Sequence, residues 1–210
     1  MSGAVRVLLA TRNAKKLAEL RRILAEAGVA GVEVVGMADV APFPEAPETG
    51  ATFEENALAK ARDAARATGL PAVADDSGLT VDALNGMPGV LSARWAGSHG
   101  DDAANLRLVL DQLTDVPDDR RGAAFVCAAA LALPDGTAPS DEAVVRGEWR
   151  GELVREPRGE NGFGYDPIFV PEGDRRTSAE LPAEEKDACS HRGRALRALL
   201  PRLRELTDTR

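Results

Sequence analysis

The chain of 210 residues contains little cysteine, little histidine and few aromatic residues. Its two cysteines, Cys127 and Cys189, lie far apart and outside any metal-ligand spacing, which argues against a disulfide framework and favours a reducing compartment. With only two histidines, His99 and His191, a histidine-based metal site is not expected. The sequence also has no GxSxG motif, which argues against a Ser-His-Asp hydrolase.

Long apolar runs are absent as well. No segment approaches the ~20 consecutive apolar residues that a membrane-spanning helix needs. The apolar run within residues 1–10 is too short for the hydrophobic region of a signal peptide. We therefore expect a cytoplasmic protein that has no membrane partner.

An excess of positive charge is absent, since 34 acidic residues outnumber 26 basic ones, the formal net charge is −8 and the isoelectric point is about 4.9. This balance argues against unspecific binding to duplex nucleic acid, which requires a basic face. A small phosphorylated ligand remains possible, because a few local cations and a metal ion can reverse the field inside a cleft. The length allows one domain or a two-lobed one with a sizeable core.

Apolar patterns predict strands that alternate with helices early in the chain and a strand-rich middle. The expected strands are 5–10, 32–35, 70–74, 125–133 and a pair within 143–154 that is broken near Gly151. The expected helices are 14–27, 53–68, 102–113 and one that starts near Ser190. Thr52 and Glu55 match a capping box at the second helix. The pattern predicts an α/β fold with a mixed sheet.

Asp75 and Asp76 directly follow the apolar run 70–74 and lead into Ser77-Gly78. Two adjacent carboxylates beside a buried strand are costly unless a cation or a proton offsets them. Carboxylates suit Mg²⁺, which usually arrives with substrate phosphates. A metal and phosphate site is therefore one interpretation, and a simple turn is the other, because Asp, Ser and Gly all form turns.

Residues 11–16 occupy an expected strand-to-helix turn. A helix N-terminus offers unpaired N–H groups and a positive dipole end, both of which favour an anion, and Lys16 could add a point charge. The alternative is that Asn13 only caps the helix and that both lysines are solvated.

Four polar residues lie before or on the second expected helix: Glu48, Glu55, Asn56 and Lys60. Asn56 and Lys60 are four positions apart and therefore share a helix face. Glu48 could be a second metal ligand, whereas Glu55 is explained by the capping box. Taken alone, the spacing favours surface roles for all four.

A glycine-rich segment, 158–166, presents Phe163 and Tyr165 among four glycines. Glycines let a backbone approach a ligand closely, and an exposed ring can stack on a nucleobase. The alternative is a tight turn with both rings packed inward. Farther along, Lys186 and the segment 190–192 precede the last helix, where they could bind a base or a phosphate.

Together these segments resemble one family, the inosine/xanthosine triphosphate pyrophosphatases, which remove non-standard purine nucleotides. Six motifs match in order along nearly the whole chain, and together they are far more specific than any one alone. They are Thr11-x-Asn13-x-x-Lys16, 48–57, 74–79, Pro88-Gly89 with 92–94, 162–167, and Glu185-Lys186 with 190–192.

The resemblance implies Mg²⁺-dependent hydrolysis of ITP, XTP and their deoxy forms to the monophosphate and pyrophosphate. It also implies a homodimer and a single domain over 1–210, with an elongated mixed sheet, flanking helices and two lobes around a central cleft. A non-catalytic nucleotide-binding module and a pyrophosphatase for other modified nucleotides remain the alternatives.

By the same resemblance, Asp76 is the catalytic acid, and Asp76 and Glu48 are metal ligands. The implied substrate-binding residues are Thr11, Arg12, Asn13, Ala14, Lys15, Lys16, Ser77, Phe163, Gly164, Tyr165, Asp166, Lys186, His191 and Arg192. Two positions depart from the family pattern: Arg12 stands where the family often has Gly, and Pro47 stands where it often has an acid.

A preference for 6-oxo purines follows from hydrogen bonding. A buried donor from His191, Arg192 or a backbone N–H would bind O6 of hypoxanthine or xanthine. The 6-amino group of adenine cannot accept that bond, so the donor would be left unpaired.

Overall fold

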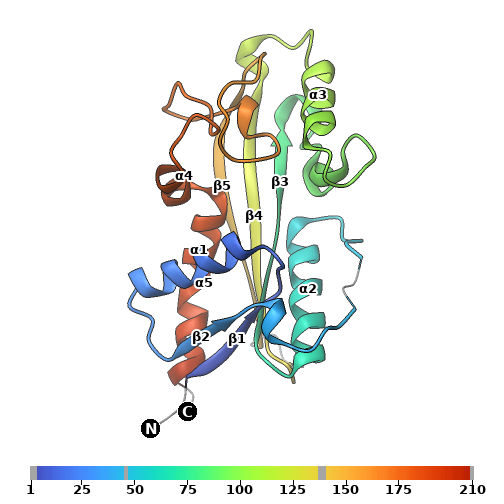
Figure 1. Cartoon of the computed structure of the whole chain (residues 1–210). Helices are drawn as coiled ribbons and strands as arrows, with labels where there is room; N and C mark the ends of the chain where they lie inside the picture. The colour runs from blue at the N-terminus through green and yellow to red at the C-terminus, as the bar shows by residue number, and fades with distance from the viewer. Residues whose placement is uncertain (1–3, 45–46, 137–140, 209–210) are drawn as a thin grey trace. The chain divides into compact units, whose positions relative to one another are not determined.

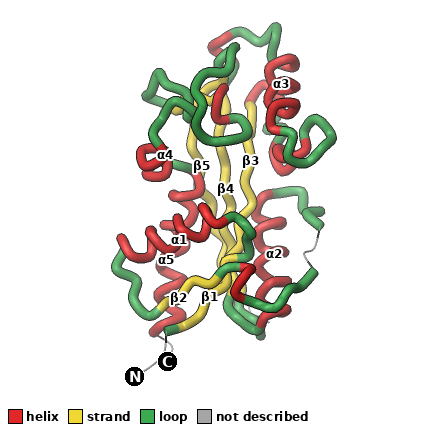
Figure 2. Tube along the Cα trace, in the orientation of Figure 1, coloured by secondary structure: helices red, strands yellow, loops and turns green. Residues whose placement is uncertain are grey.

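The computed structural model describes residues 4–44, 47–136 and 141–208, and it has a six-stranded sheet with helices beside it (Figures 1 and 2). The strand order is β2-β1-β3-β4-β5-β6. β1 pairs in parallel with β2 and β3, whereas β5 and β6 are antiparallel. The predicted α/β fold with a mixed sheet is therefore confirmed.

The strands are β1 Val5–Leu9, β2 Val32–Val35, β3 Ala72–Val81, β4 Gly122–Ala132, β5 Glu142–Leu153 and β6 Phe169–Pro171. The α-helices are α1 Ala14–Glu26, α2 Phe53–Thr68, α3 Asp102–Gln112, α4 Ala183–Cys189 and α5 His191–Asp208. The predicted helices match α1, α2, α3 and α5 closely. Two short elements, α4 and β6, were not predicted.

The chain divides into two compact units. The first unit comprises Met1–Asp76, Cys127–Gly147 and Arg192–Arg210, and the second comprises Ser77–Val126 and Glu148–His191. The backbone passes from one unit to the other at four points, and two of these, between Asp76 and Ser77 and between His191 and Arg192, lie inside predicted site motifs. A single domain over 1–210 remains a prediction.

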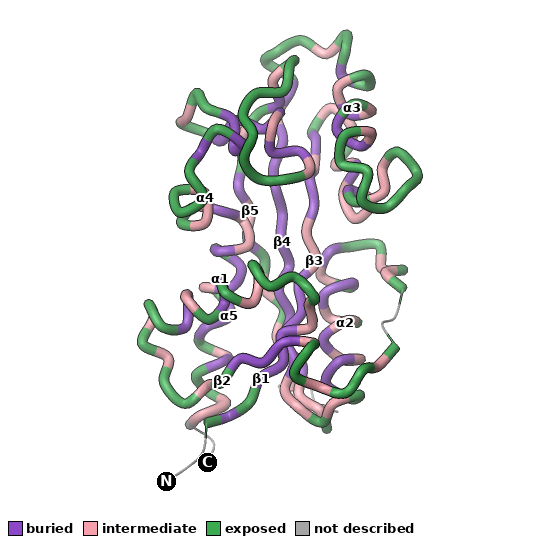
Figure 3. Tube along the Cα trace, viewed as in Figure 1, coloured by how far each residue is buried: buried purple, intermediate pink, exposed green. Residues whose placement is uncertain are grey.

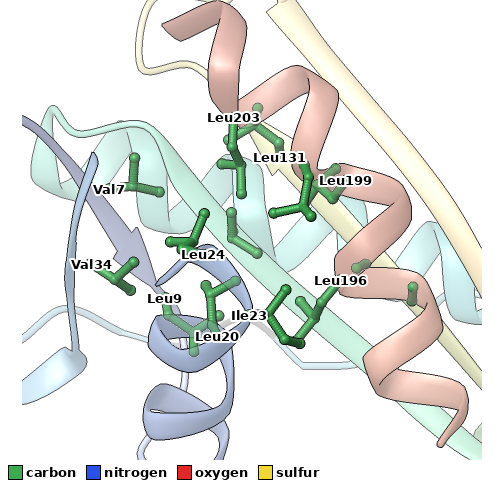
Figure 4. Packing of buried hydrophobic residues seen from close by; sticks show 14 of the residues in the cluster. Val7, Leu9, Leu20, Ile23, Leu24, Val34, Leu131, Leu196, Leu199 and Leu203 are labelled. Carbon is green, nitrogen blue, oxygen red and sulfur yellow. The ribbon is translucent and has the colours of Figure 1, made fainter. Parts of the chain in front are cut away.

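In the first unit, α1 and α5 cover one face of the strands (Figure 4). The apolar faces of both helices share one cluster with strand side chains, and its members include Leu20 and Ile23 of α1 and Leu199 and Leu203 of α5. The leucines among them follow the helical spacing that the sequence predicts. Figures 1 and 2 show α2 on the other side of β3.

The helix α2 begins after Thr52, whose hydroxyl accepts a hydrogen bond from the Glu55 amide at 3.1 Å. The predicted capping box is only half formed, because the Glu55 carboxylate accepts from the Ala51 amide instead of the Thr52 amide. The inward face of α2 carries small residues, among them Ala57 and Ala61, which are fully buried. Small side chains let the helix lie close to its neighbours.

In the second unit, the core contains Leu79, Leu113 and Phe169, all fully buried. β4 is buried along nearly its whole length (Figure 3). Arg121, at the start of this strand, is buried and donates to the carbonyl oxygens of Leu113, Leu153 and Val154. Its guanidinium thus joins the end of α3 to the end of β5.

The predicted strand break near Gly151 is wrong, because β5 continues through this position. Gly151 pairs with Pro171 of β6, and a Cβ at Gly151 would clash with the carbonyl oxygen of Val170. The glycine therefore permits the close approach of a neighbouring strand and does not mark the end of one.

Within the part of the chain that the structure describes, no helix is long and apolar enough to cross a membrane. Both cysteines are free, as the sequence predicts.

Replacing Gly151 by Ala should lower the free energy of unfolding by about 1–3 kcal/mol, because the added methyl group forces the β6 backbone away. Urea denaturation monitored by circular dichroism measures this change. Glu152→Ala, at the next and exposed position of β5, is the control and should change stability by less than ~0.5 kcal/mol. Equal stability of Gly151→Ala and wild type would contradict the account of β5.

Candidate active site

The predicted site residues fall into two groups, one within each unit. The first group comprises residues 11–16, Glu48, Asp76 and Arg192. The second group comprises Ser77, Phe163, Gly164, Tyr165, Asp166, Lys186 and His191.

Asp75, the neighbour of Asp76 on β3, is a buried carboxylate whose side chain is only 4% exposed. Lys16 Nζ of α1 lies 2.7 Å from Asp75 Oδ2, and Arg192 Nε of α5 lies 3.3 Å from the same oxygen. Burial alone would raise the pKa of Asp75, but the two cations together hold that pKa well below its usual range. Asp75 is therefore ionised and bound within the protein.

Asp76 points to the opposite face of β3, because successive side chains of a strand alternate. Its Oδ2 accepts a hydrogen bond from Asn56 Nδ2 at 3.0 Å, and its Oδ1 lies 3.5 Å from Lys60 Nζ. Both partners come from one face of α2. Burial raises the pKa of Asp76 above its usual value, and Lys60 and Asn56 oppose this rise only in part.

Glu48 and Asp76 share one cation, because Lys60 Nζ also lies 2.8 Å from Glu48 Oε1. Burial alone would lower the pKa of Lys60, but Asp76 and Glu48 raise it. Asn56 also connects the loop after Glu48 to α2, because its Oδ1 accepts a hydrogen bond from the Gly50 amide at 2.8 Å.

Two carboxylates around one cation form a site that fits Mg²⁺ chemically. Among residues 4–44, 47–136 and 141–208 there is no group of three or more His, Cys, Asp or Glu side chains arranged to hold a metal ion. Mg²⁺ does not need such a group, because it commonly binds one or two carboxylates and completes its shell with water and substrate phosphates. Asp76 and Glu48 match that donor set, and the Lys60 ammonium shows that the space between them favours positive charge.

The turn at residues 11–16 is held by its own side chains. Thr11 Oγ1 accepts from the Asn13 amide at 3.2 Å, and Asn13 Oδ1 accepts from the Lys15 amide at 2.9 Å. Asn13 therefore caps α1, as the simpler interpretation predicts. That interpretation is wrong for Lys16, which pairs with Asp75, whereas Arg12, Ala14 and Lys15 are exposed.

In the second group, Asp166 is a buried hub that is only 3% exposed. Its Oδ2 accepts from the Phe163 amide at 2.8 Å and forms an ion pair with Lys186. Its Oδ1 accepts from the Ser178 hydroxyl at 2.7 Å. The carboxylate therefore joins the glycine-rich loop to α4, which carries Lys186.

The two aromatic rings of the glycine-rich loop have different environments. Tyr165 is packed inside, where its hydroxyl donates to the Ser92 carbonyl at 2.8 Å, so inward packing is confirmed for this ring. Phe163 is 64% exposed, so inward packing is wrong for it. Lys186 Nζ lies 5.5 Å from the centre of the Phe163 ring, within reach of a cation–π interaction.

The remaining members of the second group are His191, Ser77 and Gly164. His191, the first residue of α5, stacks on Phe125 with ring centres 5.1 Å apart. Ser77 is half-buried on β3. Gly164 has a φ of +61°, which a side chain would strain.

Sequence reasoning undervalued Asn56, which is buried and holds Asp76, although surface roles were favoured for it. The signal was present in the sequence, since Asn56 and Lys60 are four positions apart on α2 and both contact Asp76. The surface interpretation is also wrong for Lys60, which is tied to two carboxylates.

Comparison with known proteins shows the family of this chain. A model of the Ham1 family matches residues 7–202, which is nearly the whole chain. The chain belongs to the Ham1 family. The predicted resemblance is therefore confirmed.

Individual Ham1-family relatives cover the chain almost completely. A protein of Nocardia farcinica named dITP/XTP pyrophosphatase is 71% identical over 203 residues, which is 97% of each chain. A crystal structure of a nucleoside-triphosphatase / dITP/XTP pyrophosphatase from Mycobacterium abscessus is 64% identical with a TM-score of 0.79, and the match covers 95% of this chain and 100% of that one. A HAM1 protein structure from Coxiella burnetii is 46% identical with a TM-score of 0.85, covering 96% and 99%.

Asp75→Asn should destabilise this Ham1-family protein by about 3 kcal/mol, because the loss of one member of a buried ion pair leaves Lys16 and Arg192 without their carboxylate. Chemical denaturation measures the change. The matched control is Asp82→Asn, whose ion pair with Arg150 is exposed and should contribute less than ~1 kcal/mol. If both variants lost the same small amount, Asp75 would not be the structural carboxylate.

Proposed function

We propose that this protein hydrolyses non-standard purine nucleoside triphosphates, namely ITP, XTP and their deoxy forms, to the monophosphate and pyrophosphate. The observation that carries the proposal is Asp76, a partly buried carboxylate that Asn56 and Lys60 hold beside Glu48. Relatives that are 64–71% identical bear the name dITP/XTP pyrophosphatase, which supports the same chemistry here.

Hydrolysis of a phosphoanhydride requires a placed water molecule and neutralisation of phosphate charge. Asp76 suits the first task, because Asn56 fixes one of its oxygens and burial raises its pKa. A carboxylate with a raised pKa is a better proton acceptor. We assign Asp76 to orienting the water and accepting its proton, and Lys60 to neutralising charge beside it.

We propose Mg²⁺ as the cofactor, held by Asp76 and Glu48. When bound, it would neutralise phosphate charge, which is the role that paired carboxylates and substrate phosphates usually give this ion. Lys16 and Arg192 contribute more indirectly, because their contacts with Asp75 fix the strand that carries Asp76.

The second group supplies chemistry suited to a base. Phe163 offers an exposed ring for stacking, which is worth about 1–3 kcal/mol for a nucleobase. We propose that Phe163, Gly164, Lys186 and His191 contact the base and that a donor among them binds O6. Asp166 is assigned to holding Phe163 and Lys186 in place. The buried Tyr165 is assigned to holding the loop.

We further propose that the protein acts on free nucleotides in the cytoplasm, as a homodimer. The net charge of −8 supports a small substrate rather than nucleic acid. The two free cysteines suit a reducing compartment. The dimer follows from the family resemblance, and light scattering coupled to size-exclusion chromatography tests it.

A substrate panel tests the proposed activity. With Mg²⁺, pyrophosphate release should be fast from dITP and XTP and at least about 100-fold slower from dATP, which lacks the 6-oxo acceptor. Asp76→Asn should slow release from dITP by about 10²-fold to 10⁴-fold, because an amide cannot accept the proton. Asp82→Asn, an exposed aspartate of the second unit, is the control and should keep wild-type activity.

No release from any nucleotide, with XTP or ITP still bound, would contradict the proposed function and support a non-catalytic nucleotide-binding module. Fast release from modified pyrimidine nucleotides alone would instead support a pyrophosphatase for another base.

Glu48→Gln should raise the Mg²⁺ concentration needed for half-maximal activity by about tenfold or more, because it removes one anionic metal ligand. A Mg²⁺ titration of dITP hydrolysis measures this shift. Glu55→Gln is the matched control, since Glu55 is exposed and bonds the Ala51 amide at the same helix end. An unchanged Mg²⁺ requirement in Glu48→Gln would remove Glu48 from the metal site.

A further inference from the structure

Two successive amides of the glycine-rich loop are bound by carboxylates of the protein itself. The Phe163 amide donates to Asp166 Oδ2 at 2.8 Å, and the Gly164 amide donates to Asp102 Oδ2 at 2.9 Å. Adjacent N–H groups of this kind can bind an external anion. Here both donors are already used, so the loop is built to present the Phe163 ring and not to hold a phosphate.

Asp102 belongs to a different element, the first turn of α3, and lies 62 positions before Gly164. A groove of about 890 Å³ is lined by one face of α3 and by the glycine-rich loop. Its α3 side includes Leu106 and Leu110, and its loop side includes Phe163 and Gly164. Where a groove separates two elements, side-chain packing contributes less to their alignment, and a hydrogen bond between them matters more.

Neither the backbone conformation nor burial fixes the tip of the loop. Gly162 and Gly164 flank Phe163 with φ of +81° and +61°, so the backbone on both sides adopts conformations that only glycine adopts easily. Phe163 itself is 64% exposed, so burial does not hold its ring. The position of the ring therefore depends on the Lys186 ammonium, which lies 5.5 Å from its centre, and on the hydrogen bonds of the loop backbone, two of which go to Asp166 and Asp102.

We propose that Asp102 is a positioning residue for base recognition, which acts through the Gly164 amide to hold Phe163 where it stacks on the substrate base. The proposal rests on the proposed function, because it assigns Phe163 to the base. Asp102 does not contact the reacting atoms, so its loss weakens nucleotide binding and leaves the chemical step intact. The hydrogen bond from the Gly164 amide goes to a carboxylate, and such charge-assisted hydrogen bonds are stronger than neutral ones.

The test compares Asp102→Ala with Asp102→Asn, which keeps an acceptor oxygen in place. Asp102→Ala should raise KM for dITP by about tenfold and change kcat by less than about twofold. Asp102→Asn should restore KM to within about threefold of wild type. Hydrogen–deuterium exchange of peptides covering 159–168 should become faster in Asp102→Ala alone.

Two controls separate positioning from a general effect on α3. Asp101→Ala removes the side chain that caps α3 by accepting from the Ala104 amide, and it should leave KM unchanged. In a Phe163→Ala background, Asp102→Ala should raise KM by less than about twofold, because the residue on which it acts is gone.

Unchanged KM and unchanged exchange in Asp102→Ala would overturn the proposal, and so would a full KM effect in the Phe163→Ala background. If the wild-type protein hydrolyses no nucleotide, the proposed function fails. In that case calorimetric binding of ITP replaces KM, and the same variants, with the exchange measurement, still decide the role of Asp102.

Discussion

Asp75 and Asp76 place two negative charges side by side on one buried strand, and the first unit is organised around neutralising them. Because strand side chains alternate, the two carboxylates leave β3 on opposite faces and need cations from both directions. Lys16 of α1 and Arg192 of α5 supply one face, and Lys60 of α2 supplies the other. Each of these three helices therefore supplies a cation to the strand as well as an apolar or close-packed face.

The two carboxylates differ in what their surroundings leave them able to do. Asp75 is surrounded by two cations, and its pKa is held low, so it is a fixed negative charge. Asp76 shares one cation with Glu48, and burial raises its pKa. Neighbouring acids whose pKa values are pushed in opposite directions commonly divide structural and catalytic roles. In the second unit, carboxylates also serve a structural purpose, because Asp166 and Asp102 accept hydrogen bonds from backbone amides of the glycine-rich loop.

Local signals in the sequence predicted much of this molecule. Helical spacing located α5 and its buried leucines, and the capping residues located the starts of α1 and α2. Pairings across long distances had no such signal. Arg192 and Asp75 are 117 positions apart, and a strand-pattern argument could not reveal that Gly151 lies against the backbone of β6. The family motifs named Asp76 and Glu48, but only the fold shows that Lys60 joins them.

The most direct test of this division is a crystal structure with Mn²⁺ in place of Mg²⁺ and an ITP analogue whose α–β bridge is an imido group. Anomalous scattering locates the Mn²⁺ ion. The ion should contact Asp76 and Glu48, while Asp75 keeps its pairs with Lys16 and Arg192. An ion coordinated by Asp75, or one that does not contact Asp76, would contradict this division.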